Sequence, residues 1–394
     1  MPKMLEVYYK GKLVGALAET PDKLIAFQYS EQWLKRGFSI SPLSLPLKDR
    51  VFIPKETARE RFHGLFGVFA DSLPDSWGEL LLDRYLKTIG ITSVSTLERL
   101  AFVGSSGMGA LEYVPAKHVE FSFNGMDYDK IAQECENVLL SRPTDMIDSL
   151  FGIGGSGGGT RPKILITDKG RDWIIKFPAA NDPGISGKRE YDYSVCAKKA
   201  GISMTDTELL PSGLCDGYFK TERFDRCSGE KVFSITFAGL LETDFRAPSC
   251  DYNTYMKLVN MLTRENRSDL EQIYRTMCFN VIAHNRDDHA KNFSFLFTES
   301  AGWRLAPSYD LTYSDTYFGE QTTSVNGKGK EIRDEDLVSV GAAAGINKNA
   351  CVEMLEDVRQ NTAELAHYIG GAPPKRTHAI DVDRLLKDLD SQLS

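Results

Sequence analysis

The sequence predicts a two-lobe α+β protein with a β-rich N-terminal half and a mostly helical C-terminal half, joined near residue 226. Up to that point, short runs of β-forming residues alternate with turn residues, which is the pattern of strands and hairpins. From Thr254 onward, apolar residues recur at the spacing of amphipathic helices. The chain has 394 residues, of which 42% are hydrophobic and 26% charged. These values are typical of a globular protein with two or three folded units, and they exclude a collagen, a coiled coil or a disordered tail.

The elements of the N-terminal half are marked by turn residues and caps. Two strands are expected within 5–17, because Gly11 lies between β-forming runs. A helix is expected over 76–86, where Ser76 and Glu79 have the spacing of a capping box. The further expected elements are a helix at 97–102 before a turn-rich stretch at 104–109, a hairpin with strands at 163–166 and 173–177, a helix at 189–200 closed by Gly201, and a strand at 217–225.

The C-terminal half is expected to be helical apart from one hairpin. The predicted helices are 254–263, 268–284, 334–345, 348–369 and 379–392. The hairpin pairs the apolar run 293–297 with 303–305.

The net charge, the N-terminal residues and the cysteine spacing limit the classes of protein to which the chain can belong. Lys plus Arg number 47 and Asp plus Glu 55, so the net charge is −8. An acidic chain repels phosphate backbones, which argues against a primary nucleic-acid binder. There is no apolar run of about 18 residues and no signal-peptide pattern at the N-terminus, so we expect a cytoplasmic protein. The seven cysteines are scattered without a C-x-x-C pair, so neither a disulfide framework nor a zinc site is indicated.

The densest group of ionisable residues lies at 284–292, between an apolar helix and an apolar strand. Asp287 and Asn292 have the separation found in the kinase catalytic loop R-D-x-x-x-x-N, where the Asp deprotonates the acceptor hydroxyl and the Asn binds Mg²⁺. A solvated loop is the alternative for any one of these residues.

Asp310 follows the strand that returns after Asn292, so its carboxylate is expected near that amide. One carboxylate and one amide oxygen suit Mg²⁺, which keeps its other positions for water and phosphates. Taken alone, Asp310 also fits a turn or a helix cap.

A glycine cluster lies upstream, with six glycines in the eight positions 152–159. Glycine lets backbone N–H groups approach phosphates closely and form an anion nest. A flexible linker is the alternative. A dinucleotide fold is unsupported, because no strand is expected before the cluster and no helix after it. The Walker pattern fails because Thr160 follows where a lysine is needed.

The strand at 173–177 carries a lysine that points away from its apolar face. Alternation places Trp173, Ile175 and Phe177 on one face and Lys176 on the other. Such a lysine either reaches solvent or binds an anion. Glu190, near the start of the next predicted helix, could pair with Lys176 as a kinase strand lysine pairs with a helix glutamate.

These motifs resemble those of the HipA family of bacterial serine/threonine kinases, which are toxins of toxin–antitoxin systems. The resemblance runs nearly from end to end. The matching strings are FADSLPDSWG at 69–78, SGGGTRPK at 156–163, IKF at 175–177, ERFDR at 222–226, DDHAKN at 287–292 and PSYD at 307–310.

The resemblance implies a protein-kinase-like fold that uses ATP and Mg²⁺. It implies a β-rich subdomain at 1–115, the rest of the N-terminal lobe with glycine loop and hinge at 116–226, and a helical lobe at 227–394. Asp287 would be the catalytic proton acceptor, and Asn292 and Asp310 would hold Mg²⁺. The residues implied to bind ATP or to support the loops around it are Ser156, Gly157, Gly158, Gly159, Lys163, Lys176, Glu222, Arg223, Phe224, His289, Asn292 and Asp310.

The resemblance also implies regulation and partners. Ser156 falls at the loop serine that these kinases autophosphorylate, and added negative charge in a phosphate-binding loop is expected to lower ATP affinity. The implied partners are a small helix-turn-helix, HipB-like antitoxin, DNA only through that antitoxin, and a protein substrate of translation such as an aminoacyl-tRNA synthetase. No membrane partner is expected.

Two other functions stay open at this level. Asp288 stands where the family often has a small residue, and a second carboxylate could raise the pKa of Asp287 or recruit a metal. Asp287, Asp288, His289 and Asp310 could therefore form a two-metal phosphoesterase centre. The chain could instead act mainly as a catalytically weak partner of a DNA-binding antitoxin.

Overall fold

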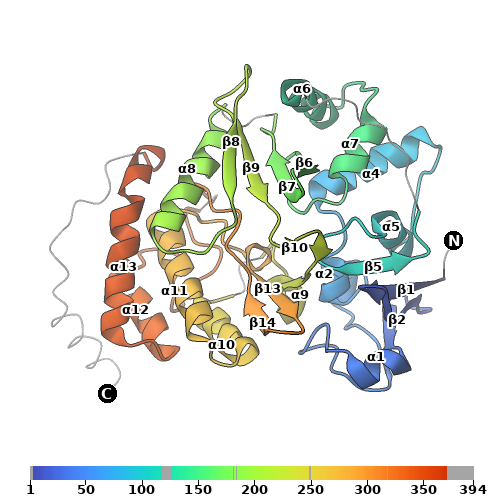
Figure 1. Ribbon diagram of the computed structural model, residues 1–394, viewed down its shortest axis with the longest axis horizontal. Coiled ribbons are helices and arrows are strands. Elements are labelled where there is room, and N and C mark those ends of the chain that lie inside the picture. Colours follow the sequence, from blue (N-terminus) through green and yellow to red (C-terminus); the bar gives the residue numbers. More distant parts are fainter. Residues whose placement is uncertain are drawn as a thin grey trace. The chain divides into compact units, whose positions relative to one another are not determined.

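The computed structural model describes residues 3–117, 127–180, 182, 184–247, 250–316 and 318–370. The chain divides into two compact units (Figure 1). The first unit comprises Met1–Lys188 and Asp206–Thr243, and the second comprises Arg189–Thr205 and Asp244–Ser394. The domain bounds expected at 115 and 226 stay a prediction.

The first unit begins with a five-stranded antiparallel sheet in the order β4-β3-β2-β1-β5. Its strands are β1 (Met4–Tyr9), β2 (Lys12–Glu19), β3 (Ile25–Tyr29), β4 (Val51–Phe52) and β5 (Leu111–Val114). The hairpin expected within 5–17 is confirmed, and Gly11 in its turn has a φ of 71°, which favours glycine.

The first unit also contains helices. They are α1 (Glu31–Arg36), α2 (Ala58–Phe62), α3 (Gly67–Ala70), α4 (Ser76–Thr88), α5 (Thr96–Val103), α6 (Tyr128–Leu139), α7 (Ile147–Gly154) and α9 (Phe237–Leu241). The helices expected at 76–86 and 97–102 are confirmed as α4 and α5. The capping box expected at Ser76 and Glu79 is wrong, because Asp75 is the N-cap and its side chain makes no capping bond. A capping box does form in α5, between Ser95 and Glu98.

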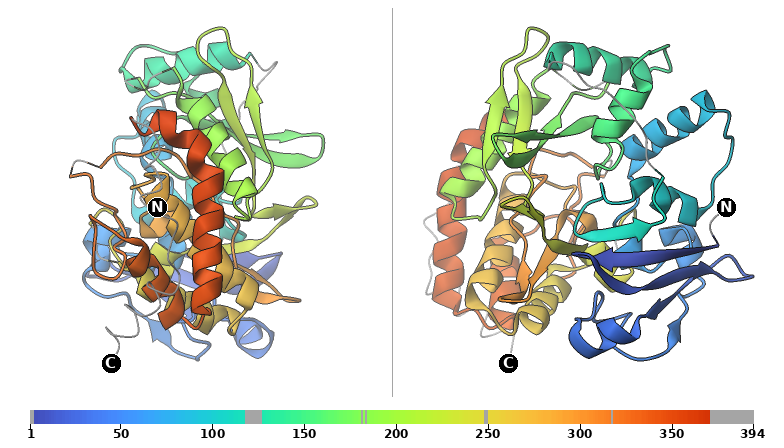
Figure 2. Two further views of the ribbon diagram at one scale, coloured as in Figure 1. Left: turned by 90° about the vertical axis from the view of Figure 1, so that its left-hand side faces the viewer. Right: turned by 45° about the vertical axis from the view of Figure 1, so that its right-hand side comes forward.

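A four-stranded antiparallel sheet, in the order β6-β7-β9-β8, is a second sheet of the first unit (Figure 2). Its strands are β6 (Lys163–Asp168), β7 (Arg171–Lys176), β8 (Thr207–Leu210) and β9 (Tyr218–Glu222), and the chain continues through β10 (Arg226–Cys227), β11 (Glu230–Lys231) and β12 (Phe233–Thr236). The predicted hairpin at 163–177 is thus confirmed.

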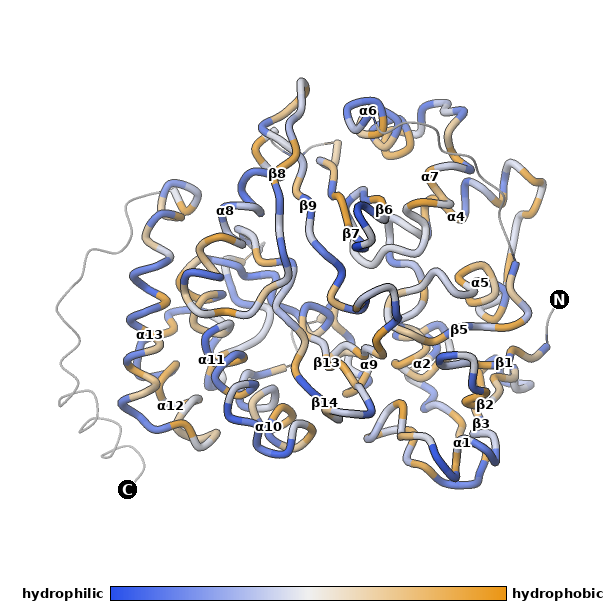
Figure 3. The backbone as a smooth tube through the Cα atoms, viewed as in Figure 1, coloured by the Kyte–Doolittle hydropathy of each residue, from blue (hydrophilic) through white to orange (hydrophobic). Residues whose placement is uncertain are grey.

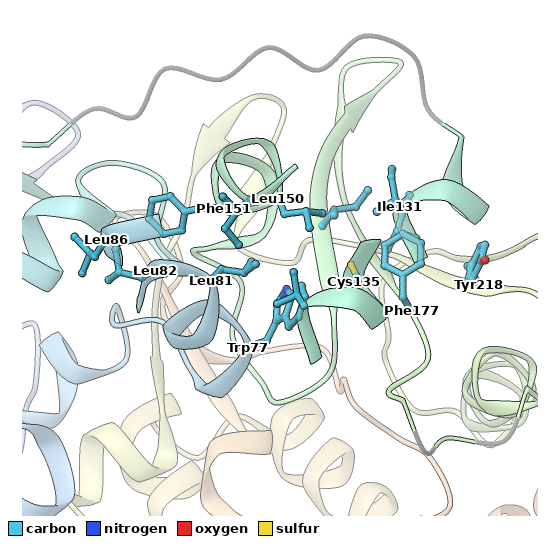
Figure 4. Close-up of a cluster of buried hydrophobic side chains, with 14 residues drawn as sticks. Trp77, Leu81, Leu82, Leu86, Ile131, Cys135, Leu150, Phe151, Phe177 and Tyr218 are labelled. Carbon is cyan, nitrogen blue, oxygen red and sulfur yellow. The ribbon is translucent and has the colours of Figure 1, made fainter. Parts of the chain in front are cut away.

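An apolar core joins this sheet to α4, α6 and α7 (Figure 4). Trp77 and Leu81 come from α4, Leu150 and Phe151 from α7, and Ile175 from β7. Packing against this core explains why α7 runs through Gly154 despite its glycines. The expectation of a linker or nest over the whole of 152–159 is therefore wrong for its first part, which is helical.

The second unit is mostly helical, as expected. Its elements are most of α8 (Ser186–Lys199), α10 (Tyr252–Thr263), α11 (Arg267–Ile282), the 3₁₀ turn η1 (Ala290–Asn292), the hairpin β13 (Ser294–Thr298) and β14 (Gly302–Leu305), α12 (Asp334–Ala343), α13 (Lys348–Thr362) and the 3₁₀ turn η2 (Ala363–Tyr368). The helix expected over 348–369 changes to 3₁₀ geometry after Thr362. The helix expected at 379–392 lies outside the described residues.

Helix packing holds this unit together. Hydrophobic and hydrophilic residues alternate along α13, as expected for a helix with one buried face (Figure 3). That face meets α11, where the Tyr274 hydroxyl donates a hydrogen bond of 3.1 Å to the Cys351 carbonyl. No helix within the described residues is both long and apolar enough to span a bilayer.

Candidate active site

The glycine-rich segment, residues 155–163, leaves the end of α7 and leads into β6. Three of its amides donate hydrogen bonds within the protein. The Gly155 N–H donates to the Phe151 carbonyl at 2.8 Å, the Gly157 N–H to the Gly154 carbonyl at 3.1 Å, and the Gly159 N–H to Asp75 Oδ2 at 2.6 Å. Gly159 has a φ of 93°, a backbone conformation that residues with a side chain rarely adopt. This position therefore favours glycine.

Ser156 is half-buried at the beginning of this segment. It lines a cavity of about 160 Å³ within the first unit, together with Ser105, Ser106, Lys117 and the ring of Phe102. The Lys117 ammonium lies 4.8 Å from the centre of that ring. Ser156 thus sits against polar and apolar groups of the first unit rather than on an open linker.

Two lysines share one face of the second sheet. Lys163 of β6 and Lys176 of β7 are directly paired across the strands, and directly paired residues project on the same side. Lys163 is 4% exposed and donates a hydrogen bond to the Gly158 carbonyl. Lys176 is half-buried, with its ammonium 5.7 Å from the centre of the Phe219 ring. Two ammonium groups on one face next to the glycine-rich segment favour an anionic ligand.

The opposite face of β7 is apolar, as the alternation predicts. Trp173, Ile175 and Phe177 are 3%, 0% and 2% exposed. Their burial fixes the register of β7, and a shift by one residue would turn Lys176 into the core.

The string ERFDR at 222–226 is bonded to the turn-rich stretch at 104–109. Asp225, which is fully buried, accepts hydrogen bonds from the Arg223 guanidinium at 2.8 and 2.9 Å and from the Gly109 N–H at 2.6 Å. The Arg226 guanidinium donates to Asp225 at 2.9 Å and to the Gly107 carbonyl at 3.1 Å. Sequence reasoning missed Asp225, although an acid between two arginines was the available signal.

Burial and charge act in opposite directions on Asp225. Burial alone would raise its pKa, but the guanidinium groups of Arg223 and Arg226 and the Gly109 N–H outweigh burial and hold the pKa below its usual value. The Arg223 side chain is thus bonded to Asp225, and Glu222 forms an ion pair with Arg171. An adenine contact by residues 222–224 stays a prediction.

In the second unit, the loop after α11 carries the predicted catalytic residues. The Asp287 side chain is 60% exposed, and its Oδ1 lies 3.8 Å from His289 Nε2. The Asn292 side-chain amide donates to the Asp287 carbonyl at 2.7 Å. That bond uses the amide nitrogen, so the amide oxygen is the atom that could bind a cation.

His289 supports this loop from one side. Its ring packs against Phe245, with ring centres 5.3 Å apart. His289 Nδ1 is buried and has no hydrogen-bond partner among the described residues. The ring thus lies between Phe245 and Asp287, with Nε2 too far from the Asp287 carboxylate for a hydrogen bond.

Asp310 is held close to the same loop through its neighbour Tyr309. The Tyr309 hydroxyl donates to the Lys291 carbonyl at 2.7 Å and lies 2.6 Å from the Ser294 hydroxyl. This bond joins the two chain segments one residue away from Asp310 and one residue away from Asn292. Asp310 also has a φ of 54°, which is uncommon for a residue with a side chain, although aspartate adopts it more readily than most.

Asp288 has a different environment from Asp287. It is fully buried and accepts hydrogen bonds from the Tyr252 hydroxyl at 2.8 Å, Gln321 Nε2 at 3.1 Å and the Thr323 N–H at 2.9 Å. Burial raises the pKa of Asp288 to about 7, against the lowering effect of these bonds. Asp288 is thus committed to the interior, which argues against the two-metal phosphoesterase. The described residues hold no group of three or more His, Cys, Asp or Glu suited to a metal ion.

The predicted site residues belong to both compact units. Lys176 lies in the first unit, whereas Glu190, Asp287, Asn292 and Asp310 lie in the second. Glu190 is 4% exposed on α8. The structure brings Asn292 and the segment of Asp310 together within one unit, and the convergence of Lys176 with them stays a prediction.

Comparison with known protein families identifies the family of this chain. The family model described as the HipA-like C-terminal domain matches residues 155–366, and the model described as the HipA N-terminal domain matches residues 5–114. The chain belongs to the HipA family. The resemblance seen in the sequence motifs is therefore confirmed.

Individual HipA-family relatives are distant in sequence. The Sinorhizobium fredii protein Y4dM is 23% identical over 382 residues, which cover 90% of this chain and 89% of that protein. The serine/threonine-protein kinase toxin HipA of Shewanella oneidensis is 22% identical over 350 residues, covering 79% and 76%.

The HipA fold is shared over nearly the whole length. The Shewanella oneidensis HipA solved in complex with HipB and its operator DNA superposes with a TM-score of 0.69 at 19% identity, covering 99% of this chain and 95% of that chain. The expectation of an α+β, kinase-like HipA fold is thus confirmed.

Proposed function

We propose that this HipA-family protein is an ATP- and Mg²⁺-dependent protein serine/threonine kinase. The observation that carries the proposal is the construction of the loop at 287–292. Asp287 is exposed, Asn292 is bonded to its carbonyl, and Tyr309 ties the segment of Asp310 to the same loop. This set matches the roles that phosphoryl transfer requires.

In the proposed mechanism, Asp287 orients the acceptor hydroxyl and accepts its proton as the phosphoryl group is transferred. The oxygens of Asn292 and Asp310 would hold Mg²⁺, which supplies charge neutralisation at the phosphates. Lys163 and Lys176, on one face of the sheet, would bind the phosphate oxygens of ATP and stabilise charge on the transferred group.

The direct test is phosphate incorporation from labelled ATP in the presence of Mg²⁺. The wild-type protein is expected to label itself or a protein in a cell lysate. Asp287→Gln should lower the rate by roughly a hundredfold or more, because the proton acceptor is lost. Absence of label with the wild-type protein, or equal labelling by Asp287→Gln, would contradict the proposal.

Ser156 is the proposed site of autophosphorylation. The serine lies near the beginning of the glycine-rich segment, so a phosphate there would add negative charge to the segment proposed to receive the phosphates of ATP. Mass spectrometry of the labelled protein should place a phosphate on Ser156, and Ser156→Ala should keep activity for longer. Label confined to other residues would contradict this assignment.

We also propose a toxin role with a HipB-like antitoxin as partner, supported by the Shewanella HipA that was solved with HipB and operator DNA. Any DNA contact would come through the antitoxin, since this chain is acidic. The proposed substrate is a protein of translation, such as an aminoacyl-tRNA synthetase. Growth arrest on expression that disappears with Asp287→Gln and with a co-expressed neighbouring helix-turn-helix protein is the expected result.

A further inference from the structure

The start of α4 holds the glycine-rich segment through three contacts. The Asp75 carboxylate accepts from the Gly159 N–H at 2.6 Å, and the Trp77 indole N–H donates to the Lys163 carbonyl at 3.2 Å. Gly78 packs so closely on the Gly155 carbonyl that a Cβ at residue 78 would clash with it. One helix start thus fixes the beginning, the middle and the end of the segment.

Asp75 is the charged member of this set. It is the N-cap residue of α4, yet its side chain makes no capping bond. A carboxylate at an N-cap normally accepts from the first turn of its own helix. Here the carboxylate bonds the amide of a residue 84 positions further along the chain. The local bond has been replaced by a tertiary bond to the glycine-rich segment.

The bonded amide belongs to a residue whose backbone only glycine adopts readily. Gly159 has a φ of 93°, and Lys163 donates to the carbonyl of the preceding Gly158. The peptide unit between Gly158 and Gly159 is therefore bonded at both of its polar groups. Asp75 accepts from its N–H, and Lys163 donates to its carbonyl. A short glycine run without such bonds would sample many backbone shapes, and ordering it on binding would cost free energy.

We propose that Asp75 is a positioning residue for ATP, because its carboxylate holds the glycine-rich segment in the shape that receives the phosphates. The inference rests on the proposed kinase function. It gives the N-terminal string FADSLPDSWG a part in nucleotide binding, through a residue that itself touches no phosphate. Loss of the carboxylate is expected to weaken ATP binding without removing any group that takes part in the reaction.

The first test measures the segment without ATP. Hydrogen exchange should show faster exchange of the Gly159 amide in Asp75→Ala than in the wild-type protein, because an amide that loses its acceptor opens more often. Ser76→Ala is the matched control, since Ser76 is the neighbouring, exposed residue at the start of the same helix. Equal exchange in Asp75→Ala and the wild-type protein would overturn the inference whatever the activity of the protein.

The second test measures ATP affinity by calorimetric titration with Mg²⁺ in an Asp287→Gln background, which prevents turnover. Adding Asp75→Ala should raise the dissociation constant about tenfold, and Asp75→Asn about threefold, because the amide oxygen is a weaker acceptor than a carboxylate. Ser76→Ala should leave the constant unchanged. If Asp75→Ala does not fold, the isosteric Asp75→Asn decides.

The kinetic form of this test separates positioning from general damage. In proteins with Asp287 intact, Asp75→Asn should raise KM for ATP while kcat stays within about twofold. Unchanged or tighter ATP binding would overturn the inference, since tighter binding means that Asp75 competes with phosphate. Failure of the parent protein to bind ATP would contradict the proposed function itself, and with it the inference.

Discussion

Adjacent residues in this protein have opposite environments, as Asp287 and Asp288 show. Asp287 is 60% exposed at the loop surface, whereas Asp288 is fully buried among Tyr252, Gln321 and Thr323. The sequence places two carboxylates side by side and leaves their roles open. The loop turns the Asp287 side chain to the surface and the Asp288 side chain into the interior. Burial therefore distinguishes Asp287, the proposed proton acceptor, from Asp288, which forms hydrogen bonds in the interior.

Asp288 predicts a pH dependence of stability. Its pKa is raised to about 7 by burial, so the folded protein keeps a proton that the unfolded chain releases above its usual pKa near 4. The retained proton contributes to the free energy of unfolding. This contribution is fully present below pH 4, decreases as the pH rises to 7 and is lost above that. Asp288→Asn should remove this decrease in the free energy of unfolding, which amounts to roughly 3–5 kcal/mol.

Urea unfolding of both proteins at pH 5 and pH 8 checks this expectation. Relative to the wild-type protein, Asp288→Asn should gain stability at pH 8 compared with pH 5. Asp287→Asn, which changes the exposed neighbour, should leave the difference between the two pH values unaltered. Parallel pH profiles for the wild-type protein and Asp288→Asn would show that Asp288 is already ionised in the folded state.

At the scale of elements, turns and strands with local signals could be predicted from the sequence. The hairpins at 5–17 and 163–177 have turn glycines and period-two alternation, and both formed as expected. The capping box at Ser76 was wrong because the start of α4 is occupied by a tertiary contact through Asp75. Helix α7 was not predicted, because glycines disfavour a helix. Packing of its apolar residues on the core stabilises it nevertheless.

Among the candidate site residues, those with a local sequence signal could likewise be predicted, whereas those set by tertiary contacts could not. Asp287 and Asn292 could be proposed from the sequence because their spacing within one loop matches a known motif, and their roles stay a prediction. The contacts of Asp225 with Gly109 and of Tyr309 with Lys291 were missed, because these partners are distant in sequence.

The contact between Tyr309 and Lys291 predicts a specific effect on metal use. Tyr309→Phe keeps the ring and removes the hydroxyl that bonds the Lys291 carbonyl. We expect a stability cost of about 1 kcal/mol and a severalfold rise in the Mg²⁺ concentration that gives half-maximal activity. The measurement is phosphate incorporation across a Mg²⁺ titration at saturating ATP. A variant with normal metal dependence but lower stability would mean that Tyr309 serves the fold alone.

At the scale of the whole molecule, the proposed kinase function requires residues of two compact units to act on one ATP molecule. Lys163, Lys176 and the glycine-rich segment belong to the first unit, and Asp287, Asn292 and Asp310 belong to the second. Within each unit the structure explains how these residues are held. The proposal adds that a single triphosphate with its metal ion is bound by both sets.

A double-mutant cycle tests this coupling. Lys176→Met and Asp310→Asn should each weaken ATP binding in the presence of Mg²⁺ by at least about tenfold, because each removes a partner of the phosphates. The double variant should lose less than the product of the two effects, since residues that act on one group are not independent. Lys169→Met, at the exposed turn between β6 and β7, is the matched control and should bind normally. Fully multiplicative effects would indicate two separate sites.

A crystal structure with a non-hydrolysable ATP analogue and Mg²⁺ would show whether residues of both units bind one nucleotide. We expect the Lys176 ammonium to lie within about 3 Å of a phosphate oxygen. We also expect the metal ion on the same nucleotide to be bound by the oxygens of Asn292 and Asp310. A nucleotide held by the second unit with no phosphate near Lys176 would contradict the proposed function.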